Sequence, residues 1–273
     1  MTGPVRRVSA IGRSFTVRRL ALFARGVLYL GRRYRCPVCG WSLRSFVGRR
    51  SVLATTVDGY CPRCNAKARH RRIWRYLRRR TDLWSGRHRL LEVAPVWAFA
   101  RRLQRMPGIR YTGVDLWRTG PHVTVVGDVT ALPLGDASVD VVLCIHVLEH
   151  VAQDRRAIAE LYRVLESGGW ALVSAPLCLD GPTDEDPAVT DPDERARRFG
   201  EEDHVRWYGL DLGDRLRAVG FQVELDRAED IPDAEVRRYG LRRDEHLFLC
   251  RKPASPDQLS RAPAASAATT PSM

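Results

Sequence analysis

The fold depends on three neighbouring segments: RLLEVAPVWAFARRL (89–103), YTGVDLW (111–117) and GDVTALPLGDASVDVVLCIHVLEHV (127–151). Short runs within them are rich in Val, Leu and Ile, as strands buried on both faces of a parallel sheet are. These runs are Leu90–Ala94, Tyr111–Leu116 and Val139–Ile145. A helical segment, Trp97–Gln104, separates the first two runs. The order strand, helix, strand predicts an α/β protein built on a parallel sheet.

Acidic residues accompany the first two predicted strands. Glu92 lies within the first, and Asp115, 23 positions later, stands near the end of the second. Open α/β sheets bind ligands at the carboxyl ends of their strands, where an acid about 20 residues after the first turn typically holds ribose hydroxyls. The pattern predicts a nucleoside-binding half-sheet.

The same segments resemble the class I S-adenosylmethionine-dependent methyltransferases, and more closely their type 11 branch. LLEVA (90–94) is similar to the first motif of the family and YTGVDL (111–116) to the second. The most specific piece is the segment 127–151, and ELYRVLESGGWALVSAP (160–176) is similar to the helix, turn and fifth strand that follow it. Several ordered motifs carry more weight than one glycine-rich motif. The resemblance covers roughly residues 88–250 and implies a Rossmann-like, doubly wound sheet of seven strands with an antiparallel last strand.

The resemblance also implies S-adenosylmethionine as the cofactor, with Asp115 at its ribose and Asp128 beside its adenine. The implied cofactor-binding residues are Glu92, Ala94, Asp115, Leu116, Asp128, Val129 and His146. The family usually has a GxGxG pattern after the first acid, where this chain has Ala94, Val96 and Ala98. Because glycine turns more freely than alanine or valine, a decayed fold that no longer binds cofactor is an alternative.

Four cysteines form two knuckles, Cys36-x-x-Cys39 and Cys61-x-x-Cys64. This spacing predicts a structural zinc ribbon, because four thiolates fill the tetrahedral coordination of Zn²⁺. The alternatives are two unpaired thiol pairs or a redox site. Pro37, Pro62 and Gly40 in and beside the knuckles favour the ribbon.

The predicted organisation is a basic segment with an amphipathic helix (1–35), the zinc ribbon (36–66), a linking helix (67–86), the methyltransferase domain (87–252) and a disordered tail (253–273). Further predicted elements are a helix over Arg155–Glu166, a strand over Trp170–Ala175, a helix over Leu210–Val219, and a final antiparallel pair, Phe221–Leu225 and His246–Cys250. In the linking helix, an apolar stripe of Ile73, Trp74 and Leu77 is expected to pack on the sheet while the arginines stay solvated. Contact of this helix with RNA is the alternative.

Charge is distributed unevenly along the chain. Residues 1–80 contain 20 Arg, one Lys and one acid, Asp58, whereas the remainder has a net charge of −7. This asymmetry predicts that the amino-terminal part meets RNA, an anionic membrane surface or an acidic substrate. A general preference for arginine over lysine is the plainer explanation.

No apolar stretch is long enough for a transmembrane helix. The apolar segment Leu20–Leu30 is instead expected to form a basic amphipathic helix, lying on the body of the protein or on a membrane surface. The seven cysteines do not form a secreted disulfide pattern. The predicted location is the cytoplasm, either free or peripheral at a membrane.

Methyl transfer needs a positioned acceptor and, for a hydroxyl, a base. Histidine has a suitable pKa, and the candidates are His146, His150 and His204. An insertion with ten acids, residues 180–203, is expected to cover the site as a lid or to lie against the basic amino-terminal part. Because acids near the site disfavour a long polyanion, the predicted acceptor is a small molecule or a glycan. The alternative function is an RNA-binding protein or RNA methyltransferase that uses the basic half.

Overall fold

The computed structural model describes residue 17 and residues 19–48, 55–56 and 59–255. Residues 1–16 and the predicted disordered tail from residue 256 onward lie outside this part. A search of the described helices finds none with the length and apolar character of a membrane span.

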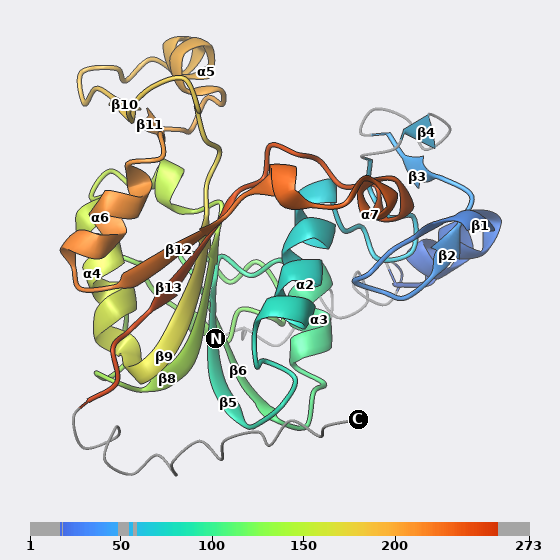
Figure 1. Ribbon diagram of the computed structural model, residues 1–273, viewed down its shortest axis with the longest axis horizontal. Helices are drawn as coiled ribbons and strands as arrows, with labels where there is room; N and C mark the ends of the chain where they lie inside the picture. Colours follow the sequence, from blue (N-terminus) through green and yellow to red (C-terminus); the bar gives the residue numbers. More distant parts are fainter. Residues whose placement is uncertain (1–16, 18, 49–54, 57–58, 256–273) are drawn as a thin grey trace, which may run out of the picture.

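A seven-stranded sheet forms the centre of the molecule, in the order β12-β13-β9-β8-β5-β6-β7 (Figure 1). Its strands are β5 (His88–Val93), β6 (Ile109–Asp115), β7 (Val125–Val126), β8 (Val139–Ile145), β9 (Leu165–Ser174), β12 (Gln222–Asp226) and β13 (Leu247–Arg251). The first five in chain order are parallel, and β13 runs antiparallel to β9 and β12. This is the predicted Rossmann-like sheet with an antiparallel last strand.

Helices cover both faces of the sheet. In Figure 1, α2 (Ala68–Arg80) and α3 (Trp97–Leu103) cover one face, and α4 (Asp154–Val164) and α6 (Leu212–Ala218) cover the other. Successive residues of a strand point to opposite faces. Accordingly, Leu90 belongs to the core on the α2 side and Leu91 to the core on the α4 side. Both are fully buried, which explains why the strand sequences are apolar without alternation.

The predicted helix Arg155–Glu166 is shorter at its carboxyl end. It ends at Val164, because Leu165 already pairs with Val139 at the start of β9. The turn continues through Gly168, whose φ of 78° is a left-handed conformation that glycine adopts at little cost.

The linking helix α2 packs its apolar stripe on the sheet as expected, with Ile73, Trp74 and Leu77 all buried. The expectation that its arginines stay solvated is wrong for two of them, because Arg71 and Arg72 are fully buried.

Arg71 is buried because four backbone carbonyls satisfy its guanidinium. It donates to Gly59 O (2.7 Å) and Ala66 O (2.9 Å) beside the second cysteine knuckle, and to Tyr239 O (2.7 Å) and Gly240 O (2.6 Å) at the end of α7 (Asp233–Tyr239). One side chain therefore joins the cysteine knuckle and α2 to a segment that lies more than 160 residues away in sequence.

The amino-terminal module consists of a helix over residues 19–28 and four short strands. The strands are β1 (Leu30–Arg35), β2 (Ser42–Leu43), β3 (Phe46–Val47) and β4 (Thr55–Thr56). One face of the helix packs on the module through Leu22 and Gly26. A Cβ on Gly26 would lie 2.8 Å from Arg63 Cδ, so this contact is close.

The opposite face of this helix is apolar and exposed. Leu20, Phe23, Val27 and Leu28 have exposed fractions between 45% and 70%. The amphipathic helix predicted over Leu20–Leu30 thus packs on the protein with only part of its apolar surface.

Candidate functional site

Three of the predicted cofactor residues meet at the carboxyl edge of the sheet. Strand β5 pairs in parallel with β6 and β8, with Val93 opposite Val114 and Cys144. The residues that follow, Ala94, Asp115 and His146, are therefore held at one edge. The strand register creates this arrangement from positions spread over more than 50 residues.

Glu92 points into the protein and orders the loop after β5. Its Oε1 accepts a hydrogen bond from Val96 N and its Oε2 from Tyr111 OH, both at 2.8 Å. The side chain is 1% exposed, and burial raises the pKa of Glu92 to about 8. Both oxygens are used within the protein, so Glu92 supports the loop that Ala94 begins.

Ala94 adopts a conformation that glycine takes more readily than alanine. Its φ is +47°, in the left-handed region, which costs an alanine about 1 kcal/mol. The loop after β5 therefore turns sharply although it lacks glycines. Gly113 in β6 makes room for it, because a Cβ there would lie 2.8 Å from Pro95 Cγ and 2.1 Å from His122 O.

Asp115 and Asp128 follow neighbouring strands and are both accessible. Asp115 Oδ1 accepts from Leu116 N at 2.8 Å, and Asp128 Oδ1 accepts from Thr130 N at 2.8 Å. These short-range bonds orient each carboxylate. Asp115 Oδ2 also accepts a longer hydrogen bond from Thr119 Oγ1 at 3.4 Å, and both side chains stay accessible to a ligand. Leu116 is 53% exposed beside Asp115 and offers an apolar surface, whereas Val129 is buried.

A cavity of about 270 Å³ lies at this edge, which we call the site cavity. On one side it is lined by Ala94–Ala98 and His146. On the other it is lined by the segment that joins the cysteine knuckles to α2, including Asn65, Lys67, Arg69 and His70. These last residues are not predictable from local patterns, because nothing near them in sequence indicates that the linker folds over the sheet edge.

His146 is held between two carboxylates. Its Nε2 is 3.0 Å from Glu245 Oε1, and its Nδ1 is 3.3 Å from Glu149 Oε1. Burial by itself lowers the pKa of His146, but Glu245 and Glu149 outweigh it and raise that pKa to about 9. The imidazole is therefore protonated at neutral pH. Its φ of 52° also places it in the left-handed region, a strain typical of functional sites.

His204 and His150 form a separate pair that does not line the site cavity. His204 is 4% exposed, and its Nδ1 lies 2.9 Å from Phe199 O. The two rings pack edge to face with centroids 4.7 Å apart. His150 Nδ1 lies 3.2 Å from Asp203 Oδ2.

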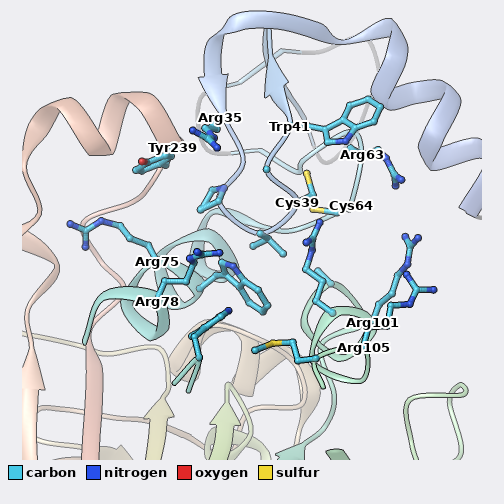
Figure 2. A pocket seen from close by; sticks show the side chains of 18 of the residues that line it. Arg35, Cys39, Trp41, Arg63, Cys64, Arg75, Arg78, Arg101, Arg105 and Tyr239 are labelled. Atoms are coloured by element: carbon cyan, nitrogen blue, oxygen red, sulfur yellow. The ribbon is translucent and has the colours of Figure 1, made fainter. Parts of the chain in front are cut away.

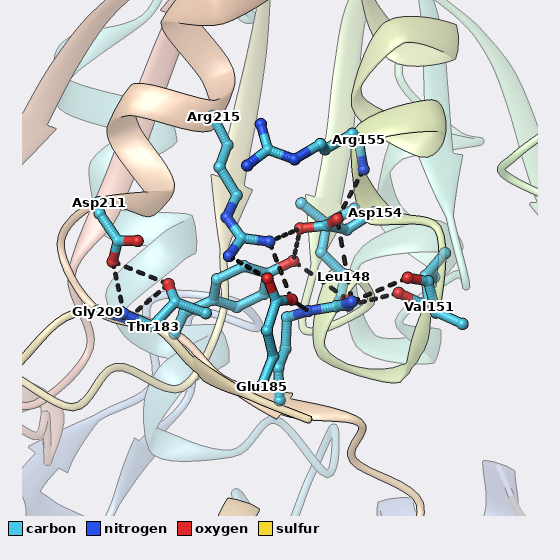
Figure 3. Close-up of polar contacts among 12 residues, drawn as sticks. Leu148, Val151, Asp154, Arg155, Thr183, Glu185, Gly209, Asp211 and Arg215 are labelled. Atoms are coloured by element: carbon cyan, nitrogen blue, oxygen red, sulfur yellow. Dashed lines mark hydrogen bonds and ion pairs between the residues drawn. The ribbon is translucent and has the colours of Figure 1, made fainter. Parts of the chain in front are cut away.

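The acidic insertion is anchored by arginines of its own part of the chain (Figure 3). Glu185 in β10 (Asp184–Glu185) binds Arg206 at 2.8 Å and Arg215 of α6 at 2.7 Å. Arg215 also binds Asp154 of α4 at 2.7 Å. The pKa of Glu185 is lowered to about 2, because its bonds to Arg215 and Arg206 outweigh burial, which by itself would raise the pKa.

The expectation that the insertion lies against the basic amino-terminal part is wrong. The insertion, with α5 (Pro192–Phe199) and β11 (Arg206–Trp207), and the cysteine module stand at opposite ends of the molecule (Figure 1). Part of its acidic charge is neutralised locally. Arg206 and Arg215, which follow the insertion in sequence, pair with Glu185, and Arg198 within the insertion pairs with Asp184 and Asp186.

The four cysteines of the two knuckles come together. Their Sγ atoms lie within 4.8 Å of one another, with 3.7 Å between Cys36 and Cys64 and 3.7 Å between Cys39 and Cys61. A tetrahedron with Zn–S bonds of about 2.3 Å has sulfur–sulfur edges of about 3.8 Å, whereas a disulfide would need about 2.05 Å. The donor set and its geometry therefore fit a tetrahedral metal ion.

The two knuckles have the same backbone fold. Gly40 N donates to Cys36 O and Asn65 N donates to Cys61 O, both at 2.8 Å. Gly40 and Asn65 both have left-handed φ values, 75° and 61°. Glycine and asparagine are the residues that adopt this conformation most readily, so the sequence after each CxxC favours the turn.

The central part of the chain is similar to known proteins. Residues 96–173 match the family model described as "Methyltransferase domain" (Methyltransf_11). A protein of Mycolicibacterium smegmatis, described as a probable S-adenosylmethionine-dependent methyltransferase, is 48% identical over 98 residues, which are 36% of this chain and 34% of that protein. An uncharacterized methyltransferase of Mycolicibacterium gilvum is 46% identical over 65 residues, 24% of each chain. The chain thus spans about a third or less of the length of these relatives.

Among solved structures, an S-adenosylmethionine-dependent methyltransferase from Mesorhizobium loti matches with a TM-score of 0.49 and 18% identity, over 65% of this chain and 96% of that chain. The [4+2]-cyclase SpnF matches with a TM-score of 0.49 and 19% identity, over 81% and 92%. The family match begins at Val96 and so excludes the cysteine module.

Proposed function

We propose that this chain, which carries a domain of the type 11 methyltransferase family on a Rossmann-like sheet, is an S-adenosylmethionine-dependent methyltransferase acting on a small-molecule or glycan acceptor. The observation that carries the proposal is the position of three residues at the ends of parallel strands: Ala94 follows β5, Asp115 ends β6 and Asp128 follows β7, at the edge where such sheets bind nucleosides. When bound, the cofactor supplies an electrophilic methyl group on sulfur. The protein positions the acceptor beside it.

We assign the ribose hydroxyls to Asp115 and the adenine end to Asp128, with Leu116 and Val129 beside the ring. The accessible carboxylate oxygens and the exposed Leu116 support this assignment. The loop at Ala94 would hold the methionine part, close to His146. Among the three predicted histidines, we place only His146 at the reacting centre, because it lines the site cavity. Its two carboxylate partners make it a fixed cation that positions groups, not a free base.

Asp115→Ala is expected to weaken S-adenosylmethionine binding about 10- to 100-fold. Two hydrogen bonds from ribose to a charged group are worth about 1.5–3 kcal/mol, and each 1.4 kcal/mol is tenfold. Calorimetric titration with the cofactor and with its demethylated product measures the effect. Asp180→Ala, which removes an exposed acid of the insertion, is the control and should bind normally. A folded wild-type protein that binds neither molecule would support the decayed-fold alternative instead.

We further propose that the four cysteines hold one structural Zn²⁺. The Sγ separations near a tetrahedral edge support zinc, and the filled coordination shell leaves no position for a substrate. The metal would therefore stabilise the module without taking part in methyl transfer.

The exposed apolar face of the helix over residues 19–28 favours a peripheral contact with an anionic membrane. Its leucines, Phe23 and Val27 would enter the interface, while Arg19, Arg32 and Arg33, all exposed, would meet lipid phosphates. An amphipathic surface of this kind binds weakly and reversibly.

Phe23→Ser/Leu28→Ser is expected to reduce binding to phosphatidylserine-containing vesicles at least tenfold, since each large apolar side chain contributes about 1.5–3 kcal/mol when fully buried. Cosedimentation with these vesicles and with pure phosphatidylcholine vesicles measures it. Val126→Ser, at another exposed apolar position, is the control. Equal binding of the double variant and the wild type would exclude the helix from the contact.

A further inference from the structure

A second cleft, of about 760 Å³, lies between the cysteine module and helices α2 and α3 (Figure 2). Eight arginines and four tryptophans line it, and none of its described lining residues is acidic. The arginines come from all three elements: Arg63 from the module, Arg78 from α2, Arg101 from α3 and Arg105 from the turn that follows α3. The assembled cleft concentrates positive charge that is spread over 70 residues of sequence. We call it the arginine cleft.

Most of this charge is not neutralised by the protein. Glu235 pairs with Arg75 and Arg79. Within the described chain, the other six arginines form no ion pair: Arg35, Arg63, Arg78, Arg101, Arg102 and Arg105. Burial and then the neighbouring Arg19 and Arg105 lower the pKa of Arg101, which reflects the crowding of like charges. A bound anion would relieve this repulsion, so the cleft is suited to a ligand with more than one negative charge.

Three tryptophans in the cleft each carry a guanidinium on their ring. The guanidinium carbon lies 5.1 Å from the ring centroid for Arg63 over Trp41, 5.5 Å for Arg78 over Trp84, and 5.5 Å for Arg101 over Trp97. The three rings are half-buried and therefore partly accessible. A planar guanidinium binds phosphate with two parallel hydrogen bonds, and an indole stacks on a base. Phosphate and a flat ring are thus the two groups that this lining recognises together.

The arginine cleft adjoins the site cavity. Cys64, Trp97 and Ala98 line both, and Trp97 begins α3 directly after the loop at Ala94. A ligand held among the arginines can therefore extend past Trp97 to His146, where the transferred methyl group would lie.

We propose that the arginine cleft binds the diphosphate and base of a nucleotide-linked acceptor, whose remaining part enters the site cavity to be methylated. This inference rests on the proposed function and names its substrate class. The volume of the cleft lies within the range of small-ligand sites, about 300–1,000 Å³. A strand of RNA offers the same groups, but a cleft of this volume has the size of a site for one small ligand and not for an extended strand. The free, nucleotide-linked molecule is therefore the better fit.

The test is calorimetric titration of the intact, metal-loaded protein with uridine diphosphate, adenosine diphosphate, inorganic pyrophosphate and a twelve-nucleotide single-stranded RNA. We expect a nucleoside diphosphate to bind in the micromolar range and pyrophosphate more weakly, because pyrophosphate lacks the ring. Arg101→Ala/Arg105→Ala should weaken nucleotide binding at least tenfold, since two charge-assisted hydrogen-bond donors are lost. Alanine suits the helical position of Arg101, and Arg110→Ala on the exposed end of β6 is the control.

Absence of nucleotide binding up to millimolar concentration would overturn the inference, and so would equal binding by the double variant at unchanged melting temperature. RNA binding a hundredfold tighter than either nucleotide would also overturn it in favour of an RNA ligand. Titration of the same samples with S-adenosylmethionine distinguishes failure of the nucleotide assignment from failure of the proposed methyltransferase function. If the cofactor binds and no nucleotide does, only the acceptor assignment fails.

Discussion

Cys64→Ser is expected to unfold the four-cysteine module and to lower the melting temperature of the whole chain. Structural zinc in small modules contributes apparent free energies of about 10–16 kcal/mol at neutral pH, far more than the four short strands of this module can supply alone. The module core, including Tyr34, Val38 and Phe46, is continuous with the core under α2 and α3. Its loss therefore exposes apolar surface of the α/β part of the chain as well.

Unfolding of the module should also weaken binding at the proposed cofactor site, because Asn65 and Lys67 form one wall of the site cavity. Metal analysis of protein purified without added zinc should give about one equivalent in the wild type. Calorimetric melting and cofactor titration should show the fall in stability and affinity. Strong chelation of the wild type should reproduce both effects.

Cys178→Ser is the matched control for this experiment. Cys178 is half-buried, follows β9, and lies outside the four-cysteine cluster. Its substitution should leave the metal content and the melting temperature nearly unchanged. A wild-type protein with less than a few tenths of an equivalent of metal, and with all four knuckle thiols open to alkylation, would contradict the zinc assignment.

Local patterns predicted the elements of this fold well because burial on both faces leaves a clear mark on a strand. Val139–Ile145 was predicted with its observed limits, and the two CxxC knuckles carry their ligands and turns within a few residues. Long-range partners left no such mark. Glu245 meets His146 across 99 positions, and Arg71 meets Tyr239 across 168. Their pairing is set by how strands and helices pack, which the sequence near each residue does not record.

Long-range packing also explains why the sequence of α2 predicts a helix with solvated arginines and no cleft. On α2 alone, Arg75 and Arg78 are ordinary solvent-facing positions. Only the docking of the module against α2 and α3 turns them into one wall of a cleft. The loop after β5 shows that a sharp turn can also form without the glycines that usually favour it. Ala94 adopts a left-handed conformation because Glu92 fixes the loop from below through Val96 N.

His146→Ala is expected to lower the free energy of unfolding by about 3–5 kcal/mol at neutral pH, because it leaves the buried carboxylates of Glu149 and Glu245 without their shared cation. The effect should depend on pH. The pKa of His146 is raised from 6.5 to about 9 on folding, since the two carboxylates outweigh burial and the nearby positive charge of Arg69. The folded state therefore holds this proton more tightly than the unfolded state. The stabilisation is fully present below about pH 6.5 and is lost as pH rises toward 9.

Chemical denaturation between pH 6 and 9.5 measures this slope. The wild type should lose stability across the window by on the order of 3 kcal/mol from His146, at 1.36 kcal/mol for each pKa unit. The loss from Glu92, whose pKa is raised to about 8, falls between about pH 4.5 and 8 and remains in the variant. His204→Ala is the matched control. It removes one buried hydrogen bond to Phe199 O, so it should cost about 1–3 kcal/mol without altering the slope above pH 8. A wild-type slope equal to that of His146→Ala would show that His146 is not the imidazolium that joins Glu149 and Glu245, and would remove the fixed cation from the site cavity.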